Sequence, residues 1–440
     1  MNTTANELLS FIRQSPSPFH AVRLMEQELA AAGYEKLYEE ETWDLQPGRT
    51  YMVSRNGSSL IAFALPEHFP SQGERGFLIT ASHSDSPSFK IKEHPELRSE
   101  NYYVKLNVEK YGGMLMAPWF DRPLSAAGRI LAGNGSRIET RLVNIDRDLL
   151  MIPSLAIHMD RSANEGHAYN PQEELLPLFG GPGAEGTFQK LAAEAAGVRE
   201  EEILGMDLYL YNRMDGSIWG ASEEFVSAPR LDDLQCAFAS LKGLLQSENS
   251  RQIRVHCVFD NEEVGSLTRQ GAASTFLKDT LTRIFQCMGA GPEAYHRALA
   301  SSFMVSADNA QAVHPNYPGK ADPSNRPCVN GGIVLKHSAN QKYTTDGVSA
   351  AVFRSICRKA DVPCQDFVNR SDVPGGSTLG NLSSAQAAMR TVDVGLPQLA
   401  MHSAYETAGV KDLEYLVKAL QVFYSSEVRV EKDEIVLDGN

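Results

Sequence analysis

The alternation of apolar and polar positions divides the chain into stretches of different texture. The first stretch is predicted to be helical, with Ser17 and Pro18 as a suitable N-cap and first residue of a helix that continues to about Gly33. Short apolar runs follow at 58–65 and 76–82. The second run is apolar almost throughout, which is typical of a strand buried on both faces of a sheet.

From about residue 88 to residue 226 the pattern changes to short segments of alternating polarity, separated by glycine and asparagine turns. Such segments predict strands, and they lie at 89–94, 102–113, 137–145 and 207–212. One helix is predicted among them, at 187–198. We therefore expect an inserted, largely β domain at 88–226.

After Pro229 the predicted helices alternate again with apolar strands. The helices are expected at 231–245, 275–288, 347–360 and about 412–426, and the strands at 253–259 and 302–307. This alternation predicts an α/β layer structure with a mainly parallel sheet. The two α/β parts, 1–87 and 227–440, are expected to form one domain that the insert interrupts.

The composition fits a globular protein of more than one domain. At 440 residues the chain is long for a single core, so two domains are expected. Apolar residues make up 42 % and charged residues 22 %, with a mean hydropathy of -0.29, as in an ordinary soluble protein. The sequence has neither a membrane-spanning apolar run nor a signal-peptide pattern, so we expect a cytoplasmic protein without a membrane partner.

Charge and cysteine spacing exclude further classes. The formal net charge of -14 and a pI near 5.3 oppose binding to nucleic acids and to anionic membrane surfaces. The six cysteines lie far apart and form no CxxC pair, so we expect reduced, mostly buried thiols rather than disulfides or a thiolate zinc site. They are Cys236, Cys257, Cys287, Cys328, Cys357 and Cys364.

Histidine and carboxylate side chains occur where predicted strands end and where the helix after Pro229 begins. In an open α/β sheet the carboxyl ends of the strands border the ligand crevice, so residues at these places are expected to meet. They are His83 and Asp85 after 76–82, Asp232 at the helix start, Glu262 and Glu263 after 253–259, Asp308 after 302–307, and His402 after the apolar run 395–401.

Two histidines and three carboxylates are a suitable ligand set for a pair of Zn, Mn or Co ions. One carboxylate then bridges both ions, and such a pair activates a shared water and polarises a substrate carbonyl. The neighbouring carboxylates allow a division of roles, with Glu263 binding metal and Glu262 acting as general base. Asp85 is placed to accept the second ring N–H of His83.

Each of these features has an ordinary structural explanation when it is taken alone. The HxD pattern at 83–85 arises by chance in many proteins, and Asp232 with Asp233 is a favourable acidic pair for a helix N-terminus. The other residues fit a solvated turn, a turn cap or a buried core histidine. Their joint occurrence after successive strands favours the metal site. Neither a GxSxG motif nor a cysteine within a known motif offers a nucleophile instead.

Longer motifs, taken in their order, resemble the aspartyl aminopeptidase family of zinc metallopeptidases. They extend over most of the chain and are specific when taken together. The motifs are SHSDSPSFKIK (82–92), YGGMLMAPWFDRPLSAAGRI (111–130), SLAIHMDR (154–161), PRLDDL (229–234), DNEEVGSLTRQGA (260–272), SADNAQAVHPNY (306–317), NQKYTTDG (340–347) and AMHSAYETAG (400–409).

The resemblance implies a role for each candidate residue. The family's metal ligands match His83, Asp232, Glu263, Asp308 and His402, with Asp232 as the bridge. The general base matches Glu262, and the acid beside the first ligand matches Asp85. Substrate-contacting positions match Lys336 and Tyr343, and a histidine donated to a neighbouring subunit's active site matches His158.

The resemblance also implies a fold, an assembly and an activity. The family has a mainly parallel α/β metallopeptidase domain with an inserted dimerisation domain, assembled into a hollow tetrahedral dodecamer. It removes Asp or Glu from the N-terminus of peptides with two divalent ions, most simply Zn. One departure concerns Gln311, because the family often has a substrate-contacting histidine three residues after the Asp308 position. Glutamine can donate a hydrogen bond but adds no positive charge.

Recognition of an acidic N-terminal residue needs two further groups. A carboxylate such as Asp308 or Glu262 can bind the substrate's free α-amine, and Lys336 is the candidate cation for the acidic side chain. Lys336 has the alternative explanation of a surface lysine at the rim of a strand. His158 is either a packed histidine of the insert or a donor that stabilises the oxyanion across an interface.

Two other functions remain open at the level of sequence. One is a related co-catalytic metal hydrolase, such as a glutamyl or leucyl aminopeptidase or a deacylase of N-acylated amino acids. The other is a non-enzymatic scaffold with a vestigial or structural metal site. A structural site would have no use for Glu262, which argues against the scaffold.

Overall fold

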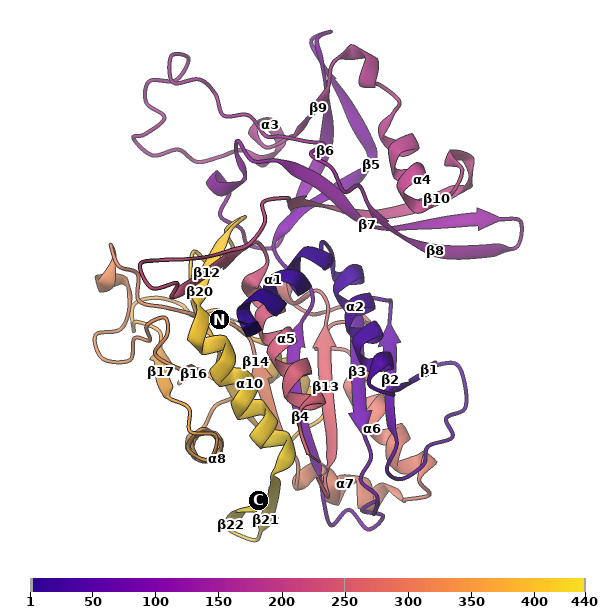
Figure 1. Ribbon diagram of the computed structural model, residues 1–440, viewed down its shortest axis with the longest axis vertical. Coiled ribbons are helices and arrows are strands. Elements are labelled where there is room, and N and C mark those ends of the chain that lie inside the picture. Colours follow the sequence, from indigo (N-terminus) through magenta and orange to yellow (C-terminus); the bar gives the residue numbers. More distant parts are fainter. Residues whose placement is uncertain (1–2, 249, 439–440) are drawn as a thin grey trace.

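The computed structural model describes residues 3–248 and 250–438, which fold around two large sheets (Figure 1). The larger sheet has nine strands and a mainly parallel arrangement. Its pairs β1–β2, β13–β4, β4–β14, β14–β18 and β16–β17 are parallel, and the other three are antiparallel. The order is β1 (Glu35–Leu37), β2 (Thr50–Arg55), β3 (Ser59–Ala64), β13 (Ile253–Phe259), β4 (Phe77–His83), β14 (Phe303–Ala307), β18 (Arg390–Gly395), β16 (Ile333–His337) and β17 (Cys364–Val368).

Helices cover both faces of this sheet, which explains why its central strands are apolar on both sides. Along β4, Leu78 packs into a core with one group of helices, whereas Phe77 and Ile79 pack into a second core on the opposite face. The first group is α1 (Thr3–Gln14), α2 (Pro18–Ala31), α5 (Leu231–Leu245), α8 (Gly347–Lys359) and α10 (Val410–Ser425). The second is α6 (Phe276–Cys287), α7 (Pro292–Ala300) and α9 (Leu379–Gln386).

Several predicted elements agree with the structure to within a residue or two. The prediction at 253–259 matches β13, and that at 231–245 matches α5. Helix α2 begins at Pro18 as predicted but ends at Ala31, two residues before Gly33. Strands β2 and β16–β18 were not among the predicted elements.

The second sheet is antiparallel and lies at one end of the nine-stranded sheet, in the upper part of Figure 1. All four strand-like segments predicted between 88 and 226 belong to it. Its order is β8 (Arg137–Asn144), β7 (Leu124–Asn134), β10 (Ile203–Asn212), β5 (Ser88–Ser99), β6 (Tyr103–Tyr111) and β9 (Leu178–Gly180). Helix α4 (Phe188–Ala196) contacts β7 and β8, and the sheet has a core of its own that includes Phe89, Leu106 and Phe188.

A smaller five-stranded sheet connects the last part of the predicted insert with the C-terminal part of the chain. Strand β12 pairs with β20, so residues 217–228 belong with this sheet rather than with the six-stranded one. The insert boundary at 226 therefore stays a prediction. The order is β11 (Ser217–Trp219), β12 (Phe225–Ala228), β20 (Glu406–Gly409), β19 (Pro397–Leu399) and β15 (Ala310–Gln311).

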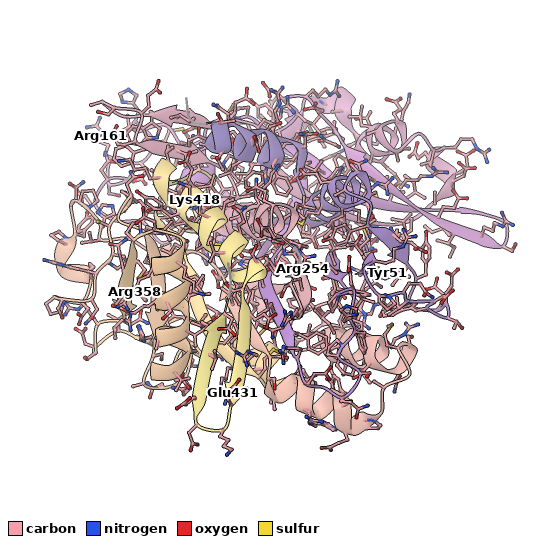
Figure 2. All side chains as sticks on the ribbon, turned by 60° about the horizontal axis from the view of Figure 1, so that its bottom comes forward. Tyr51, Arg161, Arg254, Arg358, Lys418 and Glu431 are labelled. Carbon is pink, nitrogen blue, oxygen red and sulfur yellow. The ribbon has the colours of Figure 1, made fainter. Side chains whose placement is uncertain are left out.

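The end of the molecule away from the six-stranded sheet carries a hairpin of β21 (Glu427–Glu431) and β22 (Glu434–Asp438). Figure 2 brings this end forward, with Glu431 marking the hairpin. Within residues 3–248 and 250–438, no helix has the length and apolar character needed to cross a membrane. The six cysteines are free, but Cys287 and Cys328 are exposed, so the expectation of mostly buried thiols holds only in part.

Candidate metal centre

Three neighbouring parallel strands end at the same edge of the nine-stranded sheet and deliver most of the candidate residues. His83 is the last residue of β4, and Asp308 follows β14 directly. After β13 the chain forms the short 3-10 turn η4 (Glu262–Val264), which carries Glu262 and Glu263. Because β4 lies between β13 and β14, these side chains meet above its end.

Two further candidate ligands come from other elements than these three strands. Asp232 lies in the first turn of α5, where its backbone is not helical, and its peptide bond to Asp233 is cis. His402 follows β19 and adopts a left-handed backbone conformation with a φ of 65°. The structure therefore brings together all five residues that the sequence singles out as metal ligands.

Asp232 occupies the centre of the cluster and has one carboxylate oxygen on each side. Its Oδ1 lies 3.7 Å from His83 Nε2, and its Oδ2 lies 3.3 Å from His402 Nε2. His402 Nε2 is also 3.4 Å from Glu263 Oε2. Potential ligand atoms lie within 4.8 Å of one another in three overlapping groups: His83 with Asp232, Asp233 and Asp308; His83 with Glu262 and Glu263; and Asp232 with Glu263 and His402.

The hydrogen bonds of the cluster leave its ligand atoms free for a cation. Asp232 Oδ1, Asp233 Oδ1 and Glu263 Oε1 are buried and have no hydrogen-bond partner in the described part of the chain. A buried carboxylate oxygen without a partner is costly, and a divalent cation held by several such oxygens removes that cost. The donor set of oxygens and imidazole nitrogens, without thiolate, suits zinc, manganese or cobalt.

The two histidines are oriented by backbone carbonyl groups. His83 Nδ1 lies 3.0 Å from the carbonyl oxygen of Asp85, and His402 Nδ1 hydrogen-bonds the carbonyl oxygen of Gly113. A carbonyl oxygen only accepts, so Nδ1 carries a proton in both rings, and Nε2 is the nitrogen that faces the cluster and can bind a cation. The side chain of Asp85 was expected to do this for His83, but its Oδ1 is farther away, at 3.4 Å.

The carboxylate of Asp85 holds the turn that carries the two glutamates. It accepts hydrogen bonds from the backbone N–H of Glu262 at 3.1 Å and from that of Glu263 at 3.2 Å. Tyr111 donates a third hydrogen bond to it at 2.7 Å. Asp85 is fully buried and thus fixes the position of η4 relative to β4.

Burial and mutual repulsion raise the pKa values of two carboxyl groups in the cluster. Burial, and next the repulsion from Asp232, raises the pKa of Glu263 well above its usual range. For Glu262, burial and then the charges of Asp308, Asp85 and Asp232 raise the pKa to about 8. A divalent cation would stabilise the ionised carboxylates and oppose this protonation.

The predicted substrate residues lie at different distances from this centre. Lys336 is buried on β16, so its alternative explanation as a surface lysine is wrong; its Nζ lies 3.6 Å from Asp308 Oδ1 and 5.5 Å from the ring centre of Tyr343. Gln311 is exposed on β15. His158 lies on an exposed loop between β8 and the short helix α3 (Pro171–Glu174), outside the cluster of its own chain.

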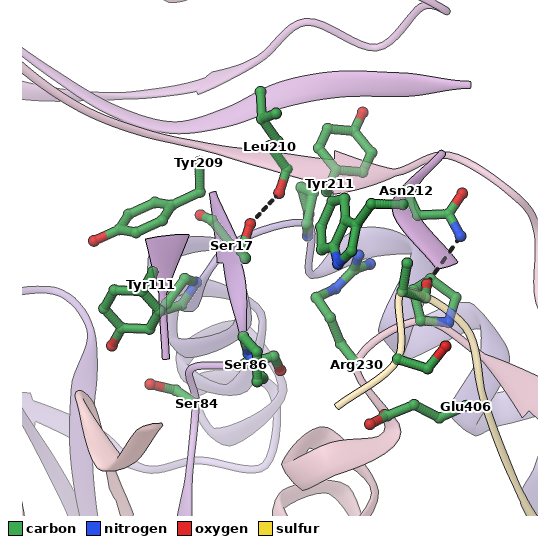
Figure 3. Close-up of a pocket in the computed structure, with 18 residues that line it drawn as sticks. Ser17, Ser84, Ser86, Tyr111, Tyr209, Leu210, Tyr211, Asn212, Arg230 and Glu406 are labelled. Atoms are coloured by element: carbon green, nitrogen blue, oxygen red, sulfur yellow. Dashed lines mark hydrogen bonds between the residues drawn. The ribbon is translucent and has the colours of Figure 1, made fainter. Parts of the chain in front are cut away.

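A pocket lies between the two large sheets, next to the cluster (Figure 3). Ser84, Ser86, Arg230 and Glu406 line it together with residues 209–212 of β10. None of the five predicted ligands is among the described residues that line it. The pocket therefore borders the metal centre rather than containing it.

Two contributors to the site were not singled out from the sequence. Asp233 is fully buried, accepts a hydrogen bond from His83 N at 3.1 Å and belongs to one of the ligand groups. Glu406 accepts from Asp232 N at 3.0 Å and from His402 N at 2.6 Å. Both stand in the quoted motifs PRLDDL and AMHSAYETAG, but a carboxylate that binds backbone N–H groups has no distinguishing pattern in the sequence.

Comparison with known proteins places this geometry in context. A family model described as aminopeptidase I zinc metalloprotease (M18) matches residues 11–424. A probable M18 family aminopeptidase 2 of Clostridium acetobutylicum is 46 % identical over 427 residues, which is 96 % of this chain and 98 % of that protein. The corresponding protein of Pseudomonas aeruginosa is 42 % identical over 427 residues, or 95 % and 97 % of the two chains.

Solved structures show the same fold. A chain in the cryo-EM structure of the Ape4 and Nbr1 complex is 37 % identical, with a TM-score of 0.92 over 96 % of this chain and 85 % of that one. A chain of the S. cerevisiae mApe1 dodecamer is 29 % identical, with a TM-score of 0.85 over 96 % of both chains.

Proposed function

The chain belongs to the aminopeptidase I zinc metalloprotease (M18) family, and from this premise we propose that it removes an acidic residue, Asp or Glu, from the N-terminus of peptides in the cytoplasm. Metal-dependent aminopeptidase activity is common to the family. The observation that carries the proposed mechanism is the position of Asp232, with one oxygen toward His83 and the other toward His402 and Glu263.

Asp232 would take part in holding each of two ions. His83 and Asp308 would complete one site, and His402 and Glu263 the other. When bound, such a pair supplies an activated water and polarises the scissile carbonyl group. Zinc is the simplest occupant given the family, and manganese and cobalt suit the same ligands.

The residues around the ions would perform the proton transfers and bind the substrate. Glu262 would take the proton of the attacking water and deliver it to the leaving amine, because it is half-buried and adjacent to the ligands. The free α-amine of the substrate needs a carboxylate nearby, and Asp308 and Glu262 are the candidates. This requirement restricts cleavage to the N-terminal residue.

Lys336 is proposed to bind the acidic side chain of the substrate. Its ammonium group lies 3.6 Å from Asp308 and donates to the carbonyl oxygen of Asn309 at 3.0 Å. An ammonium group has three N–H donors, so at least one remains for a substrate carboxylate. Gln311 would add a neutral donor to the same task, which makes Lys336 the main source of positive charge.

Replacing Lys336 by methionine is expected to lower the preference for Asp over the isosteric Asn by about ten- to a hundredfold, because one charge-assisted hydrogen bond is lost. The quantity to measure is the ratio of kcat/KM for Asp- and Asn-terminated amides. Lys336 also contacts Asp308, so the absolute rates will fall, but the ratio is independent of this shared loss.

Lys342→Met is the matched control, since Lys342 is an exposed lysine six residues further along the chain. Its ratio should equal that of the wild type. A Lys336→Met variant with an unchanged ratio would show that another group recognises the acidic side chain.

We also propose that the chain forms a homo-oligomer, a tetrahedral dodecamer in which residues 88–226 are the dimerisation domain. The S. cerevisiae relative is described as a dodecamer. Within the loop before α3, Leu155, Ile157 and Met159 are 61 %, 49 % and 75 % exposed. Exposed apolar side chains in sequence favour a protein interface, and they flank His158, which would reach the active site of a neighbouring subunit.

A further inference from the structure

The segment from Tyr111, the last residue of strand β6, to Leu115 lies against the metal centre. It starts in the six-stranded sheet, where β6 is paired with β5, and ends just before the 3-10 turn η1 (Ala117–Trp119). Its residues lie against two of the five proposed ligands, Glu263 and His402, and contact Asp85, the hydrogen-bond partner of a third, His83. This segment is called the buttress segment below.

Tyr111 connects the buttress segment to Asp85 by a hydrogen bond of fixed direction. Its hydroxyl donates to Asp85 Oδ2 at 2.7 Å, while Asn261 Nδ2 donates to the same hydroxyl at 2.9 Å. Burial, and next the charges of Asp85 and Asp260, raise the pKa of Tyr111 far above its usual range, so the hydroxyl keeps its proton and serves as a donor. Figure 3 shows Tyr111 near Ser84, with the Tyr209 side chain beside it.

Asn261 is itself held in a single orientation. Its Oδ1 accepts hydrogen bonds from Thr268 Oγ1 and from Gln270 Nε2, both at 2.8 Å. Its amide nitrogen is therefore directed at Tyr111. The chain of hydrogen bonds runs from Asn261 through Tyr111 to Asp85, which in turn holds the backbone of Glu262 and Glu263.

The next residues of the buttress segment reach the other ligands. Gly112 has a φ of +76°, and a Cβ added to it would lie 3.1 Å from the Cβ of Glu263, so a side chain at this position would crowd the ligand. The Gly113 carbonyl oxygen accepts from His402 Nδ1, and Leu115 N donates to the carbonyl oxygen of His402 at 3.0 Å. One short segment thus contacts Glu263 and His402. It also contacts Asp85, whose carbonyl oxygen bonds His83 Nδ1.

We infer that the buttress segment positions the metal ligands, with Tyr111 as a positioning residue, so that the six-stranded sheet sets the geometry of a metal centre built on the nine-stranded sheet. This inference rests on the proposed metal centre but not on its preference for acidic substrates. Hydrogen bonds to the groups behind metal ligands fix the ligands before binding, and their loss typically weakens metal affinity by about ten- to a hundredfold.

The test is the dissociation constant of Zn²⁺, measured by competition with a chromophoric chelator on the full-length protein. Tyr111→Phe removes only the hydroxyl, because the ring can still pack edge-on against Tyr209 at 5.4 Å between the ring centres. It is expected to raise the dissociation constant by about ten- to a hundredfold. Gly112→Ala, which crowds Glu263, is expected to change it in the same direction.

Tyr209→Phe is the matched control, since it removes a hydroxyl from the neighbouring ring on β10, and its zinc affinity should equal that of the wild type. The metal-free forms of all variants should stay folded and keep the same size in solution, which separates positioning from a loss of folding. Wild-type affinity in Tyr111→Phe, or an equal loss in both tyrosine variants, would overturn this inference but leave the proposed metal centre standing. A wild-type protein that binds no Zn²⁺ would overturn the proposed metal centre with it.

Discussion

Replacing Glu262 by glutamine is expected to lower kcat by about 10²- to 10⁴-fold, the usual contribution of a general base. Glutamine keeps the shape of the side chain but cannot take a proton. The backbone N–H of Glu262 remains bonded to Asp85 at 3.1 Å, so the turn η4 keeps its place. The measurement is the steady-state rate on an Asp-terminated amide, together with the metal content of the purified variant.

Glu263→Gln serves as the contrasting variant, because the two neighbours are assigned different roles. Glu263 lies 3.4 Å from His402 Nε2 and belongs to a ligand group with Asp232 and His402. Its replacement should lower the metal content, whereas Glu262→Gln should keep both ions. A Glu262→Gln variant that retains its rate to within a few-fold, or that loses metal as Glu263→Gln does, would contradict the assignment of the base.

Removing His158 is expected to lower kcat by about 10²- to 10³-fold, as the loss of one oxyanion donor does in other hydrolases. The side chain is exposed and outside the cluster of its own chain, so its effect would have to be exerted on a neighbouring subunit. His167→Ala is the matched control, because His167 lies on the same loop and pairs with Glu174 at 2.6 Å. That variant should retain the wild-type rate.

Mixed assemblies show whose active site His158 serves. Subunits with His158→Ala and subunits with Glu262→Gln are each nearly inactive, but co-expressed at equal amounts they would place an intact His158 beside an intact Glu262. With random pairing about one site in four is complete, so about a quarter of the wild-type rate should return. Mixed assemblies as inactive as their parents would show that His158 does not act across an interface.

The strand ends of the nine-stranded sheet were accessible from the sequence because their signals are local. Strands β4 and β13 are buried along their whole length and are rich in apolar residues, which distinguishes them from surface segments. In a parallel sheet, the residues that follow such strands lie at the same edge. His83, the two glutamates and Asp308 each come soon after such a strand, so they could be expected at the same edge.

Lys336 shows where this reasoning stops. Strand β16 is apolar except for its last two residues, and a lysine at such a place is usually exposed, since a buried charge needs a partner. The partner is Asp308, which comes from β14, two strands away in the sheet. A pair of this kind depends on the strand order, which the local pattern does not encode.

The role of the six-stranded sheet at the metal centre was also hidden. Its strands were predicted from their alternating polarity, but nothing in that pattern indicates that the end of β6 lies over another sheet. The bond from Tyr111 to Asp85 joins residues 26 positions apart, and that from Gly113 to His402 joins residues 289 positions apart. Such contacts follow from how the two sheets pack, which requires the folded structure.

The most direct test of the proposed function compares the hydrolysis of Asp- and Asn-terminated amides by one protein preparation, first stripped of metal with a chelator and then reloaded with zinc, manganese or cobalt. The two substrates have the same shape and differ in charge. The stripped protein should be inactive, and the reloaded protein should cleave the Asp substrate at least about ten times more efficiently in kcat/KM, as a charge-assisted contact requires. Equal cleavage of both substrates would contradict the acidic preference, and no cleavage with any of the three metals would contradict the proposed enzyme itself.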